Sequence, residues 1–99
     1  EEARMRDAIA LEVRTAADAV REAGEIVKAL TDTVRQAERL LWMAEIGYEA
    51  GVKTHLDVLD AQLNLASARG NLARARRDYL VALVHLRWAA GTLGEERFP

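Results

Sequence analysis

The feature that most constrains this chain is an apolar repeat, spaced alternately by three and four residues, that runs through two long segments. In the first segment the repeat comprises Ile9, Val13, Ala16, Val20, Ala23, Val27, Leu30, Val34, Ala37, Leu41, Ala44 and Tyr48. In the second it comprises Val58, Ala61, Leu65, Ala68, Leu72, Ala75, Tyr79, Ala82, Leu86, Ala89 and Leu93. A sustained repeat of this kind is typical of helices that supercoil around each other. We call these positions the seam, and they predict an all-α fold.

The break between the two segments has the residues of a tight turn that connects two helices. Gly51 stands where the first repeat stops, and a helix often ends with a glycine in the left-handed conformation. Thr54 can then cap the second helix, with Asp57 completing an acidic variant of the capping box. We therefore expect a long antiparallel coiled-coil helical hairpin as a single unit over residues 1–99. Its expected parts are a helix over about 3–50, a tip turn over 51–54, a helix over about 55–91 and a polar tail to 99.

A second apolar line lies beside the seam on both predicted helices. On the second helix it comprises Leu56, Leu59, Leu63, Ala66, Gly70, Ala73, Leu80 and Val84, and on the first Ala19, Ile26, Thr33 and Leu40. A helix with two apolar stripes has at least two neighbours, and one hairpin supplies only one. We therefore expect lateral packing against further hairpins, either in a homo-oligomer or within a larger parent protein. A four-helix bundle formed by dimerisation is the simpler alternative.

Composition excludes several functional classes. The formal net charge is −2, from 14 Lys and Arg against 16 Asp and Glu, whereas a dedicated nucleic-acid binder shows a basic excess. The chain has no Cys, and His55 and His85 are too far apart to form a metal site, so we expect no metal and no cofactor. Ser67 is the only serine and has no histidine partner, so we expect no catalytic residue and no enzyme. No window offers the roughly 18 uncharged apolar residues that a membrane-spanning helix needs.

Four groups of residues between Glu45 and Gly94 resemble the outer membrane efflux protein family, the TolC-like outer membrane factors. They are Tyr48-x-x-Gly51, then Leu56-Asp57-Val58-Leu59-Asp60-Ala61-Gln62, then Asn71-Leu72-Ala73-x-Ala75-x-x-Asp78-Tyr79-Leu80, and finally Ala90-Gly91-Thr92-Leu93. No one of these groups is rare, but their order and spacing over about fifty residues are specific to that family. The heptad segment from Asp7 to Leu41 resembles the incoming long helix more loosely.

The resemblance implies a trimeric parent protein whose subunits supply β-strands to an outer membrane barrel and helical hairpins to a periplasmic α-barrel. This chain resembles the second, C-terminal hairpin of each subunit, so its implied location is the periplasmic portion of an outer membrane protein in a Gram-negative cell envelope. The implied partners are a periplasmic adaptor protein and an inner membrane pump, with membrane contact only through parts of the parent that are absent here. The chain begins at Glu1 rather than at Met, and we expect it to be a segment of a longer protein.

The same resemblance assigns roles around the turn. Asp57 and Asp60 match positions at the periplasmic entrance, where three protomers bring their carboxylates into a ring that favours cations. Tyr48 and Lys53 match positions that hold the entrance shut, although many relatives carry Arg where this chain has Lys53. From the residues alone, the two aspartates could simply complement the positive end of the helix dipole, and Tyr48 could simply pack on the seam.

The turn itself, Gly51, Val52, Lys53 and Thr54, is implied to dock against the tip of an adaptor hairpin. A hairpin turn needs a glycine for conformational reasons in any case. The conformational and the docking interpretations of Gly51 are therefore compatible. The alternative from a different class is a freestanding coiled-coil scaffold or adaptor-type hairpin with no channel function. That alternative explains the seam and the turn, but it does not explain the motif from Leu56 to Gln62.

Overall fold

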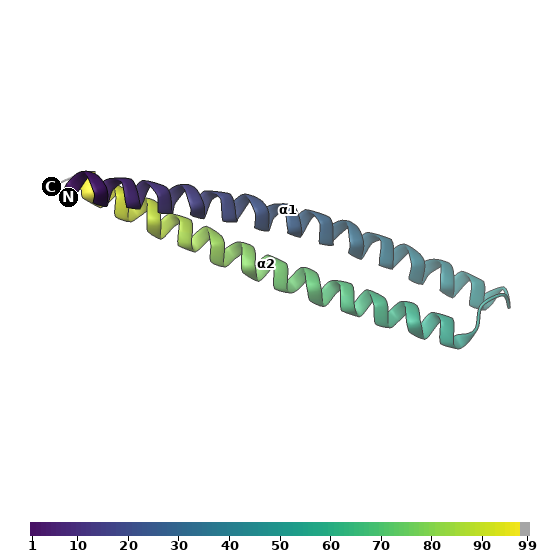
Figure 1. Cartoon of the computed structure of the whole chain (residues 1–99). Coiled ribbons are helices and arrows are strands. Elements are labelled where there is room, and N and C mark those ends of the chain that lie inside the picture. Colours follow the sequence, from purple (N-terminus) through teal and green to yellow (C-terminus); the bar gives the residue numbers. More distant parts are fainter. Residues whose placement is uncertain (98–99) are drawn as a thin grey trace. The chain divides into compact units, whose positions relative to one another are not determined.

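The computed structural model describes residues 1–97, and side chains through residue 91. Helix α1 spans Glu2–Glu49 and helix α2 spans His55–Arg97, with no strand among these residues. Figure 1 shows the two helices joined by one short turn. The expected all-α helical hairpin is confirmed.

The end of α2 differs from the expectation. We expected the helix to stop near residue 91, but it continues through Gly91 and Gly94 to Arg97. A glycine inside a helix costs about 1 kcal/mol relative to alanine but keeps its backbone hydrogen bond, so it weakens a helix without ending it. The good helix formers Glu95, Glu96 and Arg97 follow, and the only proline is the last residue. Residues 98 and 99 of the expected polar tail lie outside the described part.

The chain divides into two compact units, each made from part of α1 and part of α2. The unit that contains the turn spans Val27–Ala75. Its core consists of Val34, Ala37, Leu65, Ala68 and Leu72, with Val27, Leu30 and Leu41 packed against it. All eight are seam positions, so the large and small residues of the two helices interdigitate along the predicted line.

The other unit combines Glu1–Ile26 with the residues from Arg76 onward. Its most buried side chains are the seam alanines Ala16 and Ala89, the latter only 1% exposed. The ring of Tyr79 lies against Gly24, where an added Cβ would sit 3.4 Å from Tyr79 Cε1. Gly24 is a small residue next to the seam, and it lets the seam residue Tyr79 of the opposite helix approach α1 closely.

The second apolar line is exposed in this chain. Its large exposed members are Ile26, Leu40, Leu56, Leu59, Leu63, Leu80 and Val84. The side chain of Leu63, for example, is 64% exposed, whereas the seam residue Leu65 is 5% exposed. The expected packing of this line against further hairpins stays a prediction.

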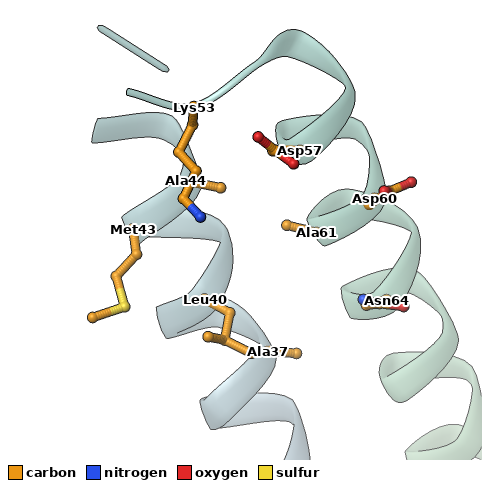
Figure 2. A pocket seen from close by; sticks show the side chains of 9 residues that line it. All are labelled: Ala37, Leu40, Met43, Ala44, Lys53, Asp57, Asp60, Ala61 and Asn64. Atoms are coloured by element: carbon orange, nitrogen blue, oxygen red, sulfur yellow. The ribbon is translucent and has the colours of Figure 1, made fainter. Parts of the chain in front are cut away.

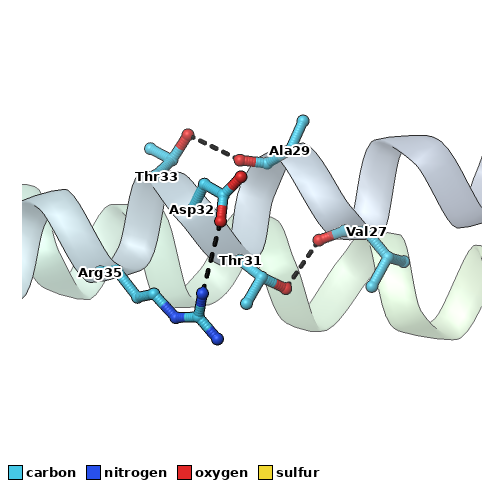
Figure 3. Close-up of polar contacts among 6 residues, drawn as sticks. All are labelled: Val27, Ala29, Thr31, Asp32, Thr33 and Arg35. Atoms are coloured by element: carbon cyan, nitrogen blue, oxygen red, sulfur yellow. Dashed lines mark hydrogen bonds and ion pairs between the residues drawn. The ribbon is translucent and has the colours of Figure 1, made fainter.

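Polar side chains of α1 bond within the helix (Figure 3). Thr31 and Thr33 donate their hydroxyls to the carbonyls of Val27 and Ala29, at 2.7 and 3.1 Å. Asp32 forms an ion pair with Arg35 at 3.6 Å. An exposed ion pair of this kind contributes little to stability.

Candidate functional site at the helical turn

Helix α1 ends in a complete Schellman motif centred on Gly51. The φ angle of Gly51 is +79°, in the left-handed region that favours glycine. The N–H of Gly51 donates to the carbonyl of Tyr48 at 3.1 Å, and the N–H of Val52 donates to the carbonyl of Gly47 at 2.9 Å. Lys53 also donates its N–H to Gly47, at 3.0 Å. These bonds satisfy carbonyls that a helix end otherwise leaves free, and the predicted stop at Gly51 is confirmed.

Helix α2 begins with the predicted capping box. The N–H of Asp57 donates to the Thr54 hydroxyl oxygen at 3.1 Å, and the N–H of Thr54 donates to Oδ2 of Asp57 at 2.8 Å. The backbone bond from Thr54 is the main reason that the pKa of the Asp57 carboxyl lies below its ordinary value of 3.8. The Thr54 side chain lowers this pKa further, and the nearby charge of Lys53 lowers it a little more. Asp57 therefore carries its charge as part of the turn.

A shallow groove of about 320 Å³ lies between the helices next to the turn (Figure 2). Its charged lining residues are Lys53, Asp57 and Asp60, three of the four residues assigned to the gate. Its other lining residues are Ala37, Leu40, Met43, Ala44, Ala61 and Asn64. In Figure 2 the side chain of Lys53 extends along α1 toward Ala44, and Asp57 points toward α1, whereas Asp60 points away from it. The fold thus brings Lys53, Asp57 and Asp60 to one groove, with the carboxylate of Asp57, but not that of Asp60, directed toward α1.

The fourth gate candidate, Tyr48, does not pack on the seam between the two helices, where the apolar repeat predicted it to lie. Its side chain is 49% exposed, and its ring packs against that of His55 at a centroid distance of 5.7 Å. Gly47 is the buried residue in this last turn of α1. The side chain of Lys53 packs over Gly47, and the half-exposed Tyr48 contacts His55 at the start of α2. The prediction that Tyr48 is a seam residue was therefore wrong.

Gly47 is the residue of this site that the sequence did not reveal. A Cβ built on it would overlap Cγ of Lys53 and lie 3.2 Å from Lys53 Cβ. In the sequence Gly47 precedes Tyr48 and lies four residues before Gly51, which is the stronger turn signal. Gly47 therefore has the appearance of an ordinary helix residue. The sequence did contain one signal, since a glycine in a helix interior lowers helix stability relative to alanine. A glycine kept at such a position usually has a packing or backbone reason.

The four residues of the proposed docking tip, Gly51 to Thr54, are all exposed. Val52 is the most prominent, at 79% exposure, and nothing lies within 4 Å of a Cβ built on Gly51. The tip therefore presents backbone and one apolar side chain directly to solvent. No group of three or more His, Cys, Asp or Glu side chains able to hold a metal occurs within the described part of the chain.

Comparisons with known proteins identify the family. The sequence model of the outer membrane efflux protein family matches residues 2–92. The chain is 40% identical over 70 residues to the outer membrane protein TolC of Vibrio cholerae, which covers 71% of this chain and 16% of that protein. It is 39% identical over 70 residues to the outer membrane protein TolC of Escherichia coli K12, covering 71% and 14%. It is 39% identical over 69 residues to the alkaline protease secretion protein AprF of Pseudomonas aeruginosa, covering 70% and 14%.

This helical hairpin belongs to the outer membrane efflux protein family. The chain spans about one seventh of the length of the curated relatives that it matches. No solved structure gave a significant match. In the described residues, neither helix is long and apolar enough to cross a membrane.

Proposed function

We propose that this chain is a hairpin of the periplasmic α-barrel of a trimeric outer membrane channel used for efflux or secretion. Family membership supports the channel class, and the relatives' names refer to an outer membrane protein and to protease secretion. The exposed second apolar line supports the barrel, because a wall hairpin needs neighbours on both sides. The same membership favours a channel component over a freestanding scaffold.

The turn of this hairpin is proposed to form the channel entrance and its gate. Lys53, Asp57 and Asp60 line one groove beside the turn, and this juxtaposition carries the proposal. Carboxylates repeated by symmetry around a pore attract cations and repel one another, so bound ions or protons favour closure. Tyr48, exposed beside His55, can reach groups outside its own hairpin and is the fourth proposed gate residue.

The tip, Gly51 to Thr54, is proposed to dock a periplasmic adaptor protein that links the channel to an inner membrane pump. The exposure of all four residues supports this role, as does the open space around Gly51. A glycine without neighbours lets a partner backbone approach closely, and the exposed Val52 offers an apolar contact. The bonds of the Schellman motif and the capping box hold these residues rigid before any partner arrives.

The gate is tested in the full-length protein that carries this hairpin. Replacing Asp57 and Asp60 together by Asn should lower cation selectivity, or weaken blockade by multivalent cations, in planar lipid bilayers. Asp32→Asn is the matched control, since Asp32 is an exposed carboxylate of the same unit that pairs with Arg35 away from the turn. Unchanged selectivity and blockade in the double variant would refute the gate assignment.

A further inference from the structure

The contact between Gly47 and Lys53 joins the last turn of α1 to the residue that follows the Schellman motif. The carbonyl of Gly47 accepts the N–H of Lys53 at 3.0 Å, so the backbones of the two residues are tied together. The stem of Lys53 then passes over the space where a Cβ of residue 47 would stand, overlapping it at Cγ and approaching it to 3.2 Å at Cβ and 3.7 Å at Cδ. These are the stem atoms nearest the backbone, so the side chain cannot clear the space by moving its far end alone.

Gly47 is not required for a special backbone conformation. Among the described residues the only positive φ is that of Gly51, and Gly47 lies within α1. A glycine in a helix interior is destabilising relative to alanine. The space that it leaves is therefore its distinguishing property, and the side chain of Lys53 occupies that space.

We propose that Gly47 is a positioning residue for Lys53: its missing side chain lets the lysine stem lie across α1 and directs the ammonium into the groove beside Asp57. Without that space the stem must leave α1 and carry its charge out of the groove. The position of the Lys53 side chain is then determined within one hairpin, by a residue that has no side chain of its own. The link to gating rests on the proposed function, but the geometry of the two residues does not.

A double-mutant cycle between positions 47 and 53 tests the positioning in the 99-residue chain. The first measurement is the pKa of Asp57, from carbon-13 NMR titration of its side-chain carboxyl. Gly47→Ala should raise this pKa toward 3.8 because the lysine charge is displaced, while the capping bonds with Thr54 remain. In a Lys53→Gly background, the same Gly47→Ala change should leave the pKa of Asp57 where Lys53→Gly alone puts it. An equal shift in both backgrounds would show that Gly47 acts on the turn as a whole and would overturn the proposal.

Thermal unfolding gives a second, independent measurement. Gly47→Ala should lower Tm while Lys53 is present, and raise it by several °C once Lys53→Gly has removed the stem, because alanine then only gains helix propensity. Gly91→Ala is the matched control: it adds the same methyl group within α2, where nothing lies within 4 Å, so its effect should not depend on residue 53. A lowering of Tm by Gly47→Ala in both backgrounds would contradict the proposal.

The link to gating is then measured separately in the full-length protein. If both proposals hold, Gly47→Ala and Lys53→Gln should change single-channel conductance in planar bilayers in the same direction. If Lys53→Gln leaves conductance unchanged while the cycle still shows coupling, the positioning stands and the role of the lysine in the gate fails. If Lys53→Gln changes conductance and the cycle shows no coupling, the gate stands and the positioning fails.

Discussion

At the scale of single residues, the aspartate that opens α2 belongs both to the turn and to the groove. Asp57 accepts the N–H of Thr54 and donates its own N–H to the Thr54 hydroxyl, so its carboxylate is part of the structure of the tip. It also lines the groove with Lys53 and Asp60. Asp60 makes no comparable bond among the described contacts and points away from α1 (Figure 2). A substitution of Asp57 therefore disturbs the cap as well as the proposed gate, whereas a substitution of Asp60 tests the proposed gate without removing a capping bond.

The lowered pKa of Asp57 predicts a specific pH dependence of stability. A carboxyl whose pKa is lower in the folded state stabilises the fold above its unfolded-state pKa, near 3.8, and this contribution is lost as pH falls through the folded-state pKa. The difference in free energy of unfolding between the wild type and Asp57→Asn should therefore be constant at neutral pH and shrink below about pH 4. Urea denaturation followed by circular dichroism, repeated across this range, measures it.

The matched variant for this pH experiment is Thr54→Ala, which removes the hydroxyl that caps α2 and helps to lower the pKa of Asp57. Loss of an N-cap hydroxyl costs about 1 kcal/mol. In this background the pH-dependent difference should become smaller. A difference of the same size with and without the hydroxyl would show that the cap is not formed in solution.

At the scale of elements, both helix ends at the turn are determined by short-range bonds. Helix α1 ends because Gly51 adopts a left-handed conformation, and α2 begins because Thr54 and Asp57 bond to each other. Only residues 50–54 separate the two helices. A turn this short leaves the chain few conformations, which is what a docking tip requires in order to bind without a large loss of entropy.

Gly51 predicts the largest effect of any single substitution within the turn. Gly51→Ala should lower the free energy of unfolding by about 1–2 kcal/mol, because a residue with a Cβ is strained in the left-handed region. Gly91→Ala makes the same chemical change inside α2, in open space, and should instead raise it by up to about 1 kcal/mol. Chemical denaturation of the two variants compares them directly. Equal effects would mean that the left-handed conformation is not maintained in solution.

At the scale of the whole molecule, the core is thin and rich in alanine. Among the described residues, six of the ten buried apolar residues are alanines, namely Ala16, Ala37, Ala44, Ala68, Ala75 and Ala89. No large side chain is fully buried among the described residues. Two packed helices bury only one face of each helix from solvent, so the exposed leucines of the second line can contact further helices.

Two leucines of α2, two residues apart, test this distribution of burial. Leu65→Ala should lower the free energy of unfolding by about 2 kcal/mol, at the low end for a buried leucine because the core is thin. Leu63→Ala should change it by less than about 0.5 kcal/mol, since this side chain is 64% exposed. Denaturation at low protein concentration measures both. A comparable loss for Leu63→Ala would show that another helix covers the second line even in the dilute chain.

The residues brought to the candidate site show how far the sequence could predict it. The Schellman stop and the capping box depend on bonds between residues at most five apart, so Gly51, Thr54 and Asp57 could be placed from sequence alone. The end of α2 was misplaced because glycines only weaken a helix, and nothing in the pattern outweighs the helix formers that follow.

The apolar repeat in the sequence is enough to predict the two helices and most of the seam. The turn is predictable from other residues, Gly51, Thr54 and Asp57, because it depends on short-range hydrogen bonds. The directions of the side chains at the tip follow instead from packing across the turn. Lys53 lies over Gly47 and Tyr48 lies against His55, and both arrangements depend on how the chain folds back across the turn. Side-chain packing of this kind leaves no periodic signal, since it is determined by the space left between particular atoms.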